Sequence, residues 1–73
     1  MWHYNKKVRA TFGHHTSCYV YANIEGIGWR RIKGGAPDGC TNLFVLFNAA
    51  KANDRPVHVY IDGSNLITTA YML

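Results

Sequence analysis

A single helix-like segment, set between strand-like runs, is the feature that most constrains the fold of this chain. Residues 41–54 carry apolar side chains at helical spacing, and Pro56 prevents the helix from continuing. Two strand-like runs follow, residues 56–61 and 66–73, and they flank the dipeptide Asp62-Gly63, which is typical of a β-hairpin. The second half of the chain is therefore predicted to form one helix followed by a hairpin.

Three short strand-like runs precede the helix: residues 7–12, 18–24 and 29–33. The first two alternate between apolar and polar side chains, which is the period of a half-buried strand, and the third is shorter. In the first run the side chains expected to face the core are Val8, Ala10 and Phe12. Turns separate the runs, and the loop at residues 34–39 is too rich in glycine and proline for regular structure.

The element order, strand, strand, strand, helix, strand, strand, predicts a mainly β (α+β) domain that spans residues 1–73. It is the order of a small five-stranded Greek-key barrel, the OB-fold. A domain of 73 residues buries only ~60% of the surface that its unfolded chain exposes, so its own core is small. Domains of this size usually need a disulfide, a metal or a partner subunit.

Composition and hydropathy exclude a disordered protein and a membrane-spanning helix, and the first residues bear on the compartment. Hydrophobic residues make up 48% of the chain and aromatic residues 14%, which is too many for a disordered protein. No apolar run approaches the ~18 residues of a membrane-spanning helix. The first ten residues lack the apolar core of a secretory signal. We therefore expect a cytoplasmic protein, or a secreted or periplasmic one if a signal has been removed.

The predicted helix is apolar around most of its circumference, which indicates burial on two sides. One stripe, which includes Leu43 and Phe47, is expected to face the barrel. The other side is expected to face another subunit, and the predicted interface residues are Phe44, Val45, Ala49 and Ala52. The sequence thus predicts a homo-oligomer.

Two cysteines and four histidines are the candidates for a covalent link or a metal site. Cys18 and Cys40 form a disulfide if both lie at the same end of the barrel, which contributes roughly 3 kcal/mol. In a reducing compartment they are instead two buried thiols, and both interpretations stay open. The adjacent pair His14-His15 lacks the spacing of metal ligands, and His58 is interpreted as a surface residue. No metal or cofactor is predicted.

No residue pattern indicates catalysis. Cysteine-based catalysis needs a thiolate, a nearby base and a third group that orients the base, and the sequence has no local signature of that kind. The chain also has only four carboxylate side chains for general acid–base work. We therefore expect a protein that is not an enzyme.

Positive charge is concentrated in the first half of the chain. The net charge is +4, and residues 1–37 hold six of the eight basic groups against a single acid, Glu25. Aromatic and basic side chains are expected on the outward face of the first three strands, and the candidate ligand-binding residues are Lys7, Arg9, Tyr19, Tyr21, Trp29, Arg31 and Lys33. Such a face suits a sugar, a protein surface, or a nucleic acid whose bases stack on the rings. The alternative is a solvated sheet surface.

Residues 49–73 resemble a family of small bacterial proteins. The shared features are an alanine-containing helix, a polar break, a V-x-V-Y strand and a final I-T-x-x-Y-like strand, and the matching residues are Ala49, Ala50, Lys51, Ala52, Val57, Val59, Tyr60, Ile67, Thr68 and Tyr71. The family is similar to subtilase-cytotoxin B subunits and includes proteins carried on mobile gene cassettes. The resemblance implies an OB-fold subunit in a ring, typically a pentamer, with the helices lining the centre. The toxin members bind cell-surface glycans.

The chain departs from this family in two respects. It has no visible signal peptide, and residues 62–65 lack the cysteine expected there in secreted relatives. Both departures argue against secretion, disulfide pairing and a toxin role, and no motif in the first half carries over a glycan site. The predicted function is a non-enzymatic oligomeric binding protein for a glycan or a protein. The alternative is a single-stranded nucleic-acid-binding protein that uses the basic aromatic face.

Overall fold

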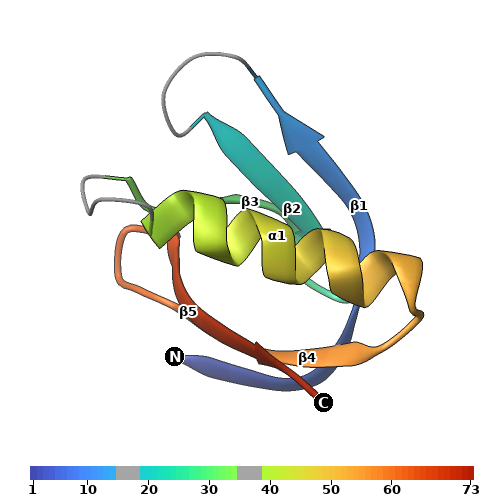
Figure 1. Ribbon diagram of the computed structural model, residues 1–73. Coiled ribbons are helices and arrows are strands. Elements are labelled where there is room, and N and C mark those ends of the chain that lie inside the picture. The colour runs from blue at the N-terminus through green and yellow to red at the C-terminus, as the bar shows by residue number, and fades with distance from the viewer. Residues whose placement is uncertain (15–18, 35–38) are drawn as a thin grey trace.

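The computed structural model describes residues 1–14, 19–34 and 39–73, and in these ranges the chain forms five strands and one helix (Figure 1). The elements are β1 (Trp2–Gly13), β2 (Val20–Ile24), β3 (Gly28–Arg31), α1 (Gly39–Ala52), β4 (Pro56–Ile61) and β5 (Ile67–Met72). The predicted order of elements is confirmed, and the protein is mainly β with one helix.

All five strands belong to one sheet with the order β3-β2-β1-β4-β5, and neighbouring strands are antiparallel. The two ends of the sheet also meet. Ile32, just beyond β3, forms a parallel bridge with Ile67 at the start of β5, and the backbone N–H of Lys33 donates to the carbonyl of Ile67 at 2.9 Å. The sheet therefore curls until its first and last strands touch, and α1 lies across it (Figure 1).

β1 is the strand that both halves of the sheet share. Its first half pairs with β4, from Trp2 opposite Tyr60 to Lys7 opposite Pro56, and its second half pairs with β2. The strand begins at Trp2 rather than at Lys7, where the alternating pattern begins. No strand is predicted for residues 2–6, because their aromatic and polar side chains do not form an apolar stripe.

Two bulges bend β1. The register against β4 shifts between His3 and Lys6, where Asn5 has a positive φ of 56°, and the register against β2 shifts between Val8 and Ala10. A bulge places an extra residue on one strand and increases its bend and twist. The two halves of β1 therefore belong to differently oriented parts of the sheet, as the long curved strand in Figure 1 shows.

The second bulge reverses the side chains that follow it. Phe12 pairs with Tyr21 and points outward, with 44% of its surface exposed. Thr11 instead pairs with the buried Ala22, and its hydroxyl donates to Oδ1 of Asn48 on α1 at 2.6 Å. The prediction that Phe12 faces the core was wrong, because a one-residue slip moves every following side chain to the other face of the sheet.

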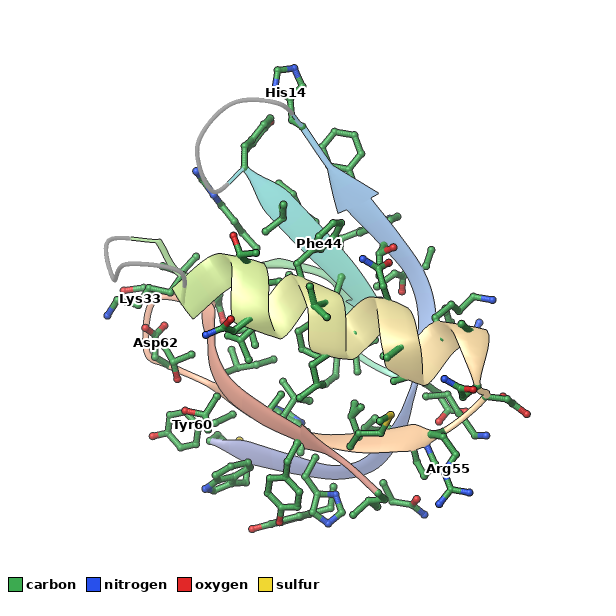
Figure 2. The ribbon with its side chains drawn as sticks, in the orientation of Figure 1. His14, Lys33, Phe44, Arg55, Tyr60 and Asp62 are labelled. Carbon is green, nitrogen blue, oxygen red and sulfur yellow. The ribbon has the colours of Figure 1, made fainter. Side chains whose placement is uncertain are left out.

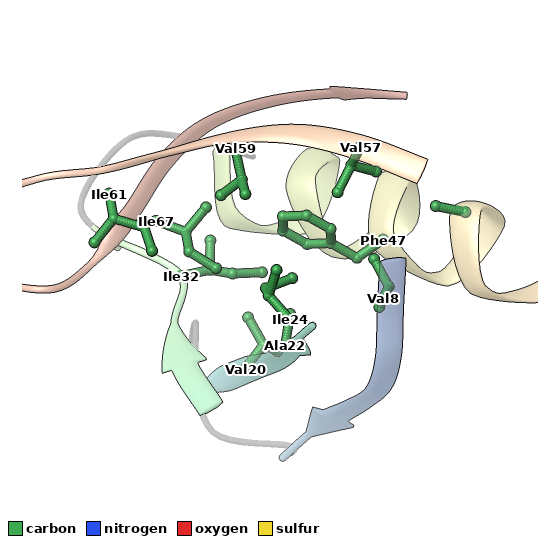
Figure 3. Close-up of a cluster of buried hydrophobic side chains, with 11 residues drawn as sticks. Val8, Val20, Ala22, Ile24, Ile32, Phe47, Val57, Val59, Ile61 and Ile67 are labelled. Atoms are coloured by element: carbon green, nitrogen blue, oxygen red, sulfur yellow. The ribbon is translucent and has the colours of Figure 1, made fainter. Parts of the chain in front are cut away.

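The core lies between the curled sheet and α1 (Figure 3). Phe47 projects from α1 into this cluster and is fully buried. The buried members come from both halves of the sheet and from the helix: Val8, Val20, Ala22, Ile24, Ile32, Phe47, Ala50, Val57, Val59, Ile61 and Ile67. Because burial of one large apolar side chain contributes about 1.5–3 kcal/mol, this single cluster stabilises both halves together.

The predicted interface residues on α1 differ in how exposed they are in the single chain. Phe44 is partly buried and packs against the core, whereas Val45 is 61% exposed. Ala52 is also exposed and Ala49 is partly buried, and the exposed side chains of the helix include the polar residues Asn42 and Asn48. Burial in a single chain does not test the predicted contact with another subunit, so the interface role of these residues stays a prediction.

The turn between β4 and β5 confirms the predicted hairpin. The Oδ1 atom of Asp62 accepts hydrogen bonds from the backbone N–H groups of Leu66 at 3.1 Å and Ser64 at 2.9 Å, and Asn65 adopts a left-handed φ of 63°. The Leu66 N–H is the main cause that lowers the pKa of Asp62 below its ordinary value, and the Ser64 N–H and the charge of Lys33 act in the same direction against the effect of burial. The ionised carboxylate therefore holds this turn.

Candidate ligand-binding face

Aromatic side chains form two clusters on the outer surface of the sheet. The Trp29 face lies on β2 with the residue just before it, on β3 and on the second half of β1, and consists of Phe12, Tyr19, Tyr21 and Trp29. The Trp2 face lies on β4, β5 and the first half of β1 and consists of Trp2, Tyr4, His58, Tyr60 and Tyr71. The bend in β1 places them on differently oriented parts of the sheet.

Strand pairing assembles the Trp29 face. Phe12 stands opposite Tyr21, and Trp29 stands opposite Asn23, so that these side chains share one side of the sheet. The rings of Phe12, Tyr19 and Tyr21 contact one another edge to face, with centroids 5.6–6.1 Å apart, an arrangement that aromatic rings prefer. The second bulge of β1 is what adds Phe12 to this face.

A shallow hollow opens in the Trp29 face. Its volume is about 260 Å³, and its lining residues are Phe12, Tyr21 and Trp29. Trp29 is 47% exposed, so part of this residue is accessible to a ligand. The volume lies just below the ~300 Å³ at which pockets for small molecules begin, which suits a single ring of a larger ligand. Of the three lining residues, Tyr21 and Trp29 belong to the predicted site and Phe12 does not.

The predicted cations do not all gather on the Trp29 face. The guanidinium of Arg31 lies over the ring of Tyr19, 5.1 Å from its centroid, where the ring quadrupole attracts it. The ammonium of Lys7 instead contacts Asp54, at 2.7 Å from the backbone carbonyl and 3.1 Å from Oδ1. Lys33 lies 3.7 Å from Oδ2 of Asp62, and Figure 2 shows this pair side by side near the start of α1. Arg9 is exposed at the second bulge of β1.

Arg30 covers the outer edge of β3 beside the Trp29 face. Because the backbone N–H of Ile32 donates to the carbonyl of Val20, the alternation of an antiparallel ladder points the backbone groups of Trp29 and Arg31 away from β2. Nη1 of Arg30 donates to that outward carbonyl of Trp29 at 2.8 Å. Its Nε is buried without a hydrogen-bond partner. The guanidinium thus occupies the side on which another strand would pair.

The Trp2 face is not part of the predicted site. Trp2 contacts Tyr4, Tyr60 and Tyr71, with ring centroids 5.4–6.3 Å apart, and His58 contacts Tyr4 and Tyr71 at 4.9 and 5.0 Å. Nδ1 of His58 accepts the backbone N–H of Asn5 at 3.0 Å, so the bulge is tied to this cluster. The sequence indicates part of the Trp2 face, since the alternation in β4 turns His58 and Tyr60 outward. The pairing with β1 is what adds Trp2 and Tyr4.

Several predicted features concern cysteine, histidine and membrane insertion. Cys18 and His15 lie outside the described residues, as does the side chain of Cys40, so the disulfide question stays as the sequence left it. Within residues 1–14, 19–34 and 39–73, no group of three or more His, Cys, Asp or Glu side chains is placed to hold a metal ion. In the same ranges no helix has the length and apolar character needed to cross a membrane.

Comparison of the chain with protein-family models, with curated proteins and with solved structures gives no match. The geometry of the two aromatic faces is therefore the ground on which a function is argued.

Proposed function

We propose that this chain is a non-enzymatic, oligomeric binding protein with an OB-like Greek-key barrel, and that the Trp29 face holds its ligand. The barrel assignment is supported by the sheet order β3-β2-β1-β4-β5, by the parallel contact between Ile32 and Ile67, and by the position of α1 between β3 and β4. In OB-folds the ligand commonly lies against the second and third strands, and the Trp29 face is built on these strands.

A glycan is the ligand class that the Trp29 face fits best. The observation that carries this proposal is the open hollow lined by the rings of Phe12, Tyr21 and Trp29. Indole and phenol rings combine a flat apolar face with a polar tip, which matches a pyranose ring with its C–H face and its hydroxyl rim. Lys7 and Lys33 are turned toward Asp54 and Asp62, so the face presents less positive charge than the sequence predicts and is better matched to an uncharged ligand.

The test is a titration of the full chain with neutral methyl pyranosides and their di- and trisaccharides, followed by two-dimensional NMR. We expect shifts at the backbone amides around Phe12, Tyr21 and Trp29, and Trp29→Ala should weaken binding about tenfold or more. The matched control is Tyr71→Ala on the Trp2 face, where the side chain is 49% exposed. The proposal is wrong if no neutral saccharide shifts these amides, or if both variants bind equally well.

Single-stranded nucleic acid is the second candidate ligand. It is favoured by the guanidinium of Arg31 above the ring of Tyr19 and by the concentration of basic groups in the first half of the chain. Bases stack on such rings, and arginine neutralises the phosphates. Titration with an oligothymidylate at two salt concentrations tests it. Binding that weakens steeply as salt rises supports a nucleic acid, and no binding at low salt removes this candidate.

A further inference from the structure

The Trp2 face is a feature of the surface that ligand binding at the Trp29 face leaves unexplained. Two of its rings, Tyr4 and Tyr71, are among the exposed large apolar side chains, at 60% and 49%. Contiguous apolar patches on the surface of a small protein mark interaction sites. We propose that the Trp2 face, together with the adjoining edge of β5, is the surface on which a second copy of this chain docks. This inference locates the contact of the oligomer in the proposed function.

The rings of the Trp2 face are held in place before any partner arrives. Trp2, Tyr4, His58 and Tyr71 contact one another in a closed cycle, and Tyr60 packs its edge against Trp2. The hydrogen bond from the Asn5 N–H to Nδ1 of His58 fixes one member of the cycle to the backbone. Side chains that are already immobilised lose little conformational entropy on association. Tyr and Trp are also enriched in the energetic centres of protein interfaces.

Charge decides between a second copy and a polar or acidic partner. Each copy carries a net charge of +4, so two copies repel each other wherever their basic groups meet. Arg31 lies on the Trp29 face and the guanidinium of Arg30 lies at its edge, so like charges would meet if two copies joined there. The cluster of rings on the Trp2 face includes no charged side chain, and the N-terminal ammonium of Met1 beside it donates to the carbonyl of Ile61 at 2.6 Å. Arg55 lies at its margin, where Nε donates to the carbonyl of Leu73 at 2.9 Å. With the charged groups at its margin engaged by backbone carbonyls, the centre of this face is a surface on which like-charged copies can meet.

The two outer strands of the sheet differ in a way that also selects β5. Because the N–H of Leu73 donates to the carbonyl of Pro56, the ladder alternation points the backbone N–H groups of Ala70 and Met72 away from β4. Such groups are a template for another strand. At the other end of the sheet the guanidinium of Arg30 covers the corresponding edge of β3. A β5-to-β5 contact is therefore available at Ala70 and Met72, whereas the edge of β3 already holds Arg30 and, just beyond the strand, the bridge from Ile32 to Ile67.

The arrangement specifies the symmetry of the pair. An isologous dimer uses the same patch on both copies, whereas a ring joins two different patches. Since β5 offers an open edge and β3 does not, the two copies pair β5 with β5 about a twofold axis. This symmetry differs from the pentameric ring that the family resemblance implies.

Native mass spectrometry and sedimentation of the full chain at micromolar concentrations test this contact. We expect a dimer for the unmodified chain. Tyr71→Lys should weaken association about tenfold or more, because it places two symmetry-related charges in the contact. Trp29→Lys is the matched control, since Trp29 and Tyr71 are 47% and 49% exposed, and it should leave the dimer intact. Met72→Pro should also weaken the dimer, because it removes an edge N–H without breaking the ladder with β4.

Circular dichroism and the thermal midpoint show whether each variant is folded, and Met72→Pro gives an independent reading if Tyr71→Lys does not fold. A monomer for the unmodified chain, a pentamer, or a dimer that persists in folded Tyr71→Lys and Met72→Pro overturns the inference. Loss of the dimer in Val45→Lys but not in Tyr71→Lys overturns it as well and assigns the contact to α1. Saccharide binding at the Trp29 face is measured separately on the same samples, so failure of the contact and failure of the ligand proposal are told apart.

Discussion

The two aromatic faces of this protein use similar residues to build different surfaces. On the Trp29 face the rings surround a hollow of about 260 Å³, and Arg31 lies above Tyr19. On the Trp2 face the rings contact one another directly, and no charged side chain takes part in the cluster. On the Trp29 face a hollow lies between the rings, which suits a small ligand. On the Trp2 face the rings close the surface, which suits a large partner. The same strand, β1, contributes a ring to both.

The largest effect is expected where one residue supports both faces. Phe47 is fully buried among side chains from both halves of the sheet. Phe47→Ala should therefore lower the free energy of unfolding by about 3–5 kcal/mol. Chemical denaturation monitored at both faces checks this. Both signals should move together, and Val45→Ala on the exposed side of α1 should change little. A loss confined to one face would mean that the two halves have separate cores.

The next largest effect on stability is expected at the first bulge of β1, which is tied to the Trp2 face. Asn5 has a φ of 56° at the first bulge of β1, a conformation that asparagine tolerates and a β-branched residue does not. Asn5→Val should lower the free energy of unfolding by about 1–3 kcal/mol and disorder the contact with His58. Asn5→Gly is the control, because glycine adopts this φ without strain. Equal stability of the two variants in thermal unfolding would contradict this account of the bulge.

A smaller effect is expected on the side of the Trp29 face. A Cβ atom added at Gly13 would lie 2.9 Å from Cζ of Phe44, a ring that packs against the core. Figure 2 shows Phe44 directed from α1 toward β1 and β2. Gly13→Ala should therefore destabilise the protein by about 1 kcal/mol. Gly63→Ala is the control, since nothing lies within 4 Å of a Cβ there. The two unfolding midpoints should differ, and an unchanged midpoint for Gly13→Ala would show that the ring has room to move.

The smallest effect is the pH dependence of stability that arises from Asp62 in the β4–β5 turn. This turn joins two strands of the Trp2 face. The pKa of Asp62 is lowered in the folded chain, chiefly by the N–H of Leu66. The stabilisation is therefore fully present above the unfolded pKa of about 3.8 and is lost as the pH falls through the folded value. Asp62→Asn should be less stable than the unmodified chain at pH 7, and the difference in thermal midpoint should shrink below pH 4. A difference that stays constant down to pH 2 would contradict this origin.

The element order and the hairpin could be predicted because each depends on local pattern. The alternation in β2 and β4 and the Asp62-Gly63 turn are readable within a few residues of the sequence. Tyr21 and Trp29 were identified in the same way, since period-two spacing decides which side chains point outward.

The remaining features depend on contacts between distant segments. Lys7 and Asp54 are 47 positions apart, and only the fold brings them together. The bulges of β1 are set by its simultaneous pairing with β2 and β4, so the outward position of Phe12 is not encoded in the alternation of its own strand. The Trp2 face was missed for the same reason, because its rings come from β1, β4 and β5.

The most direct test of the separate roles of the two faces uses the chain's own tryptophans, one on each face. In Trp2→Phe the remaining indole reports the hollow, and in Trp29→Phe it reports the Trp2 face. We predict that a bound saccharide changes the fluorescence of Trp29 alone and that dilution below the dimer dissociation constant changes the fluorescence of Trp2 alone. Saccharide-dependent emission from Trp2, or dilution-dependent emission from Trp29, would contradict the assignment of ligand binding and self-association to different faces.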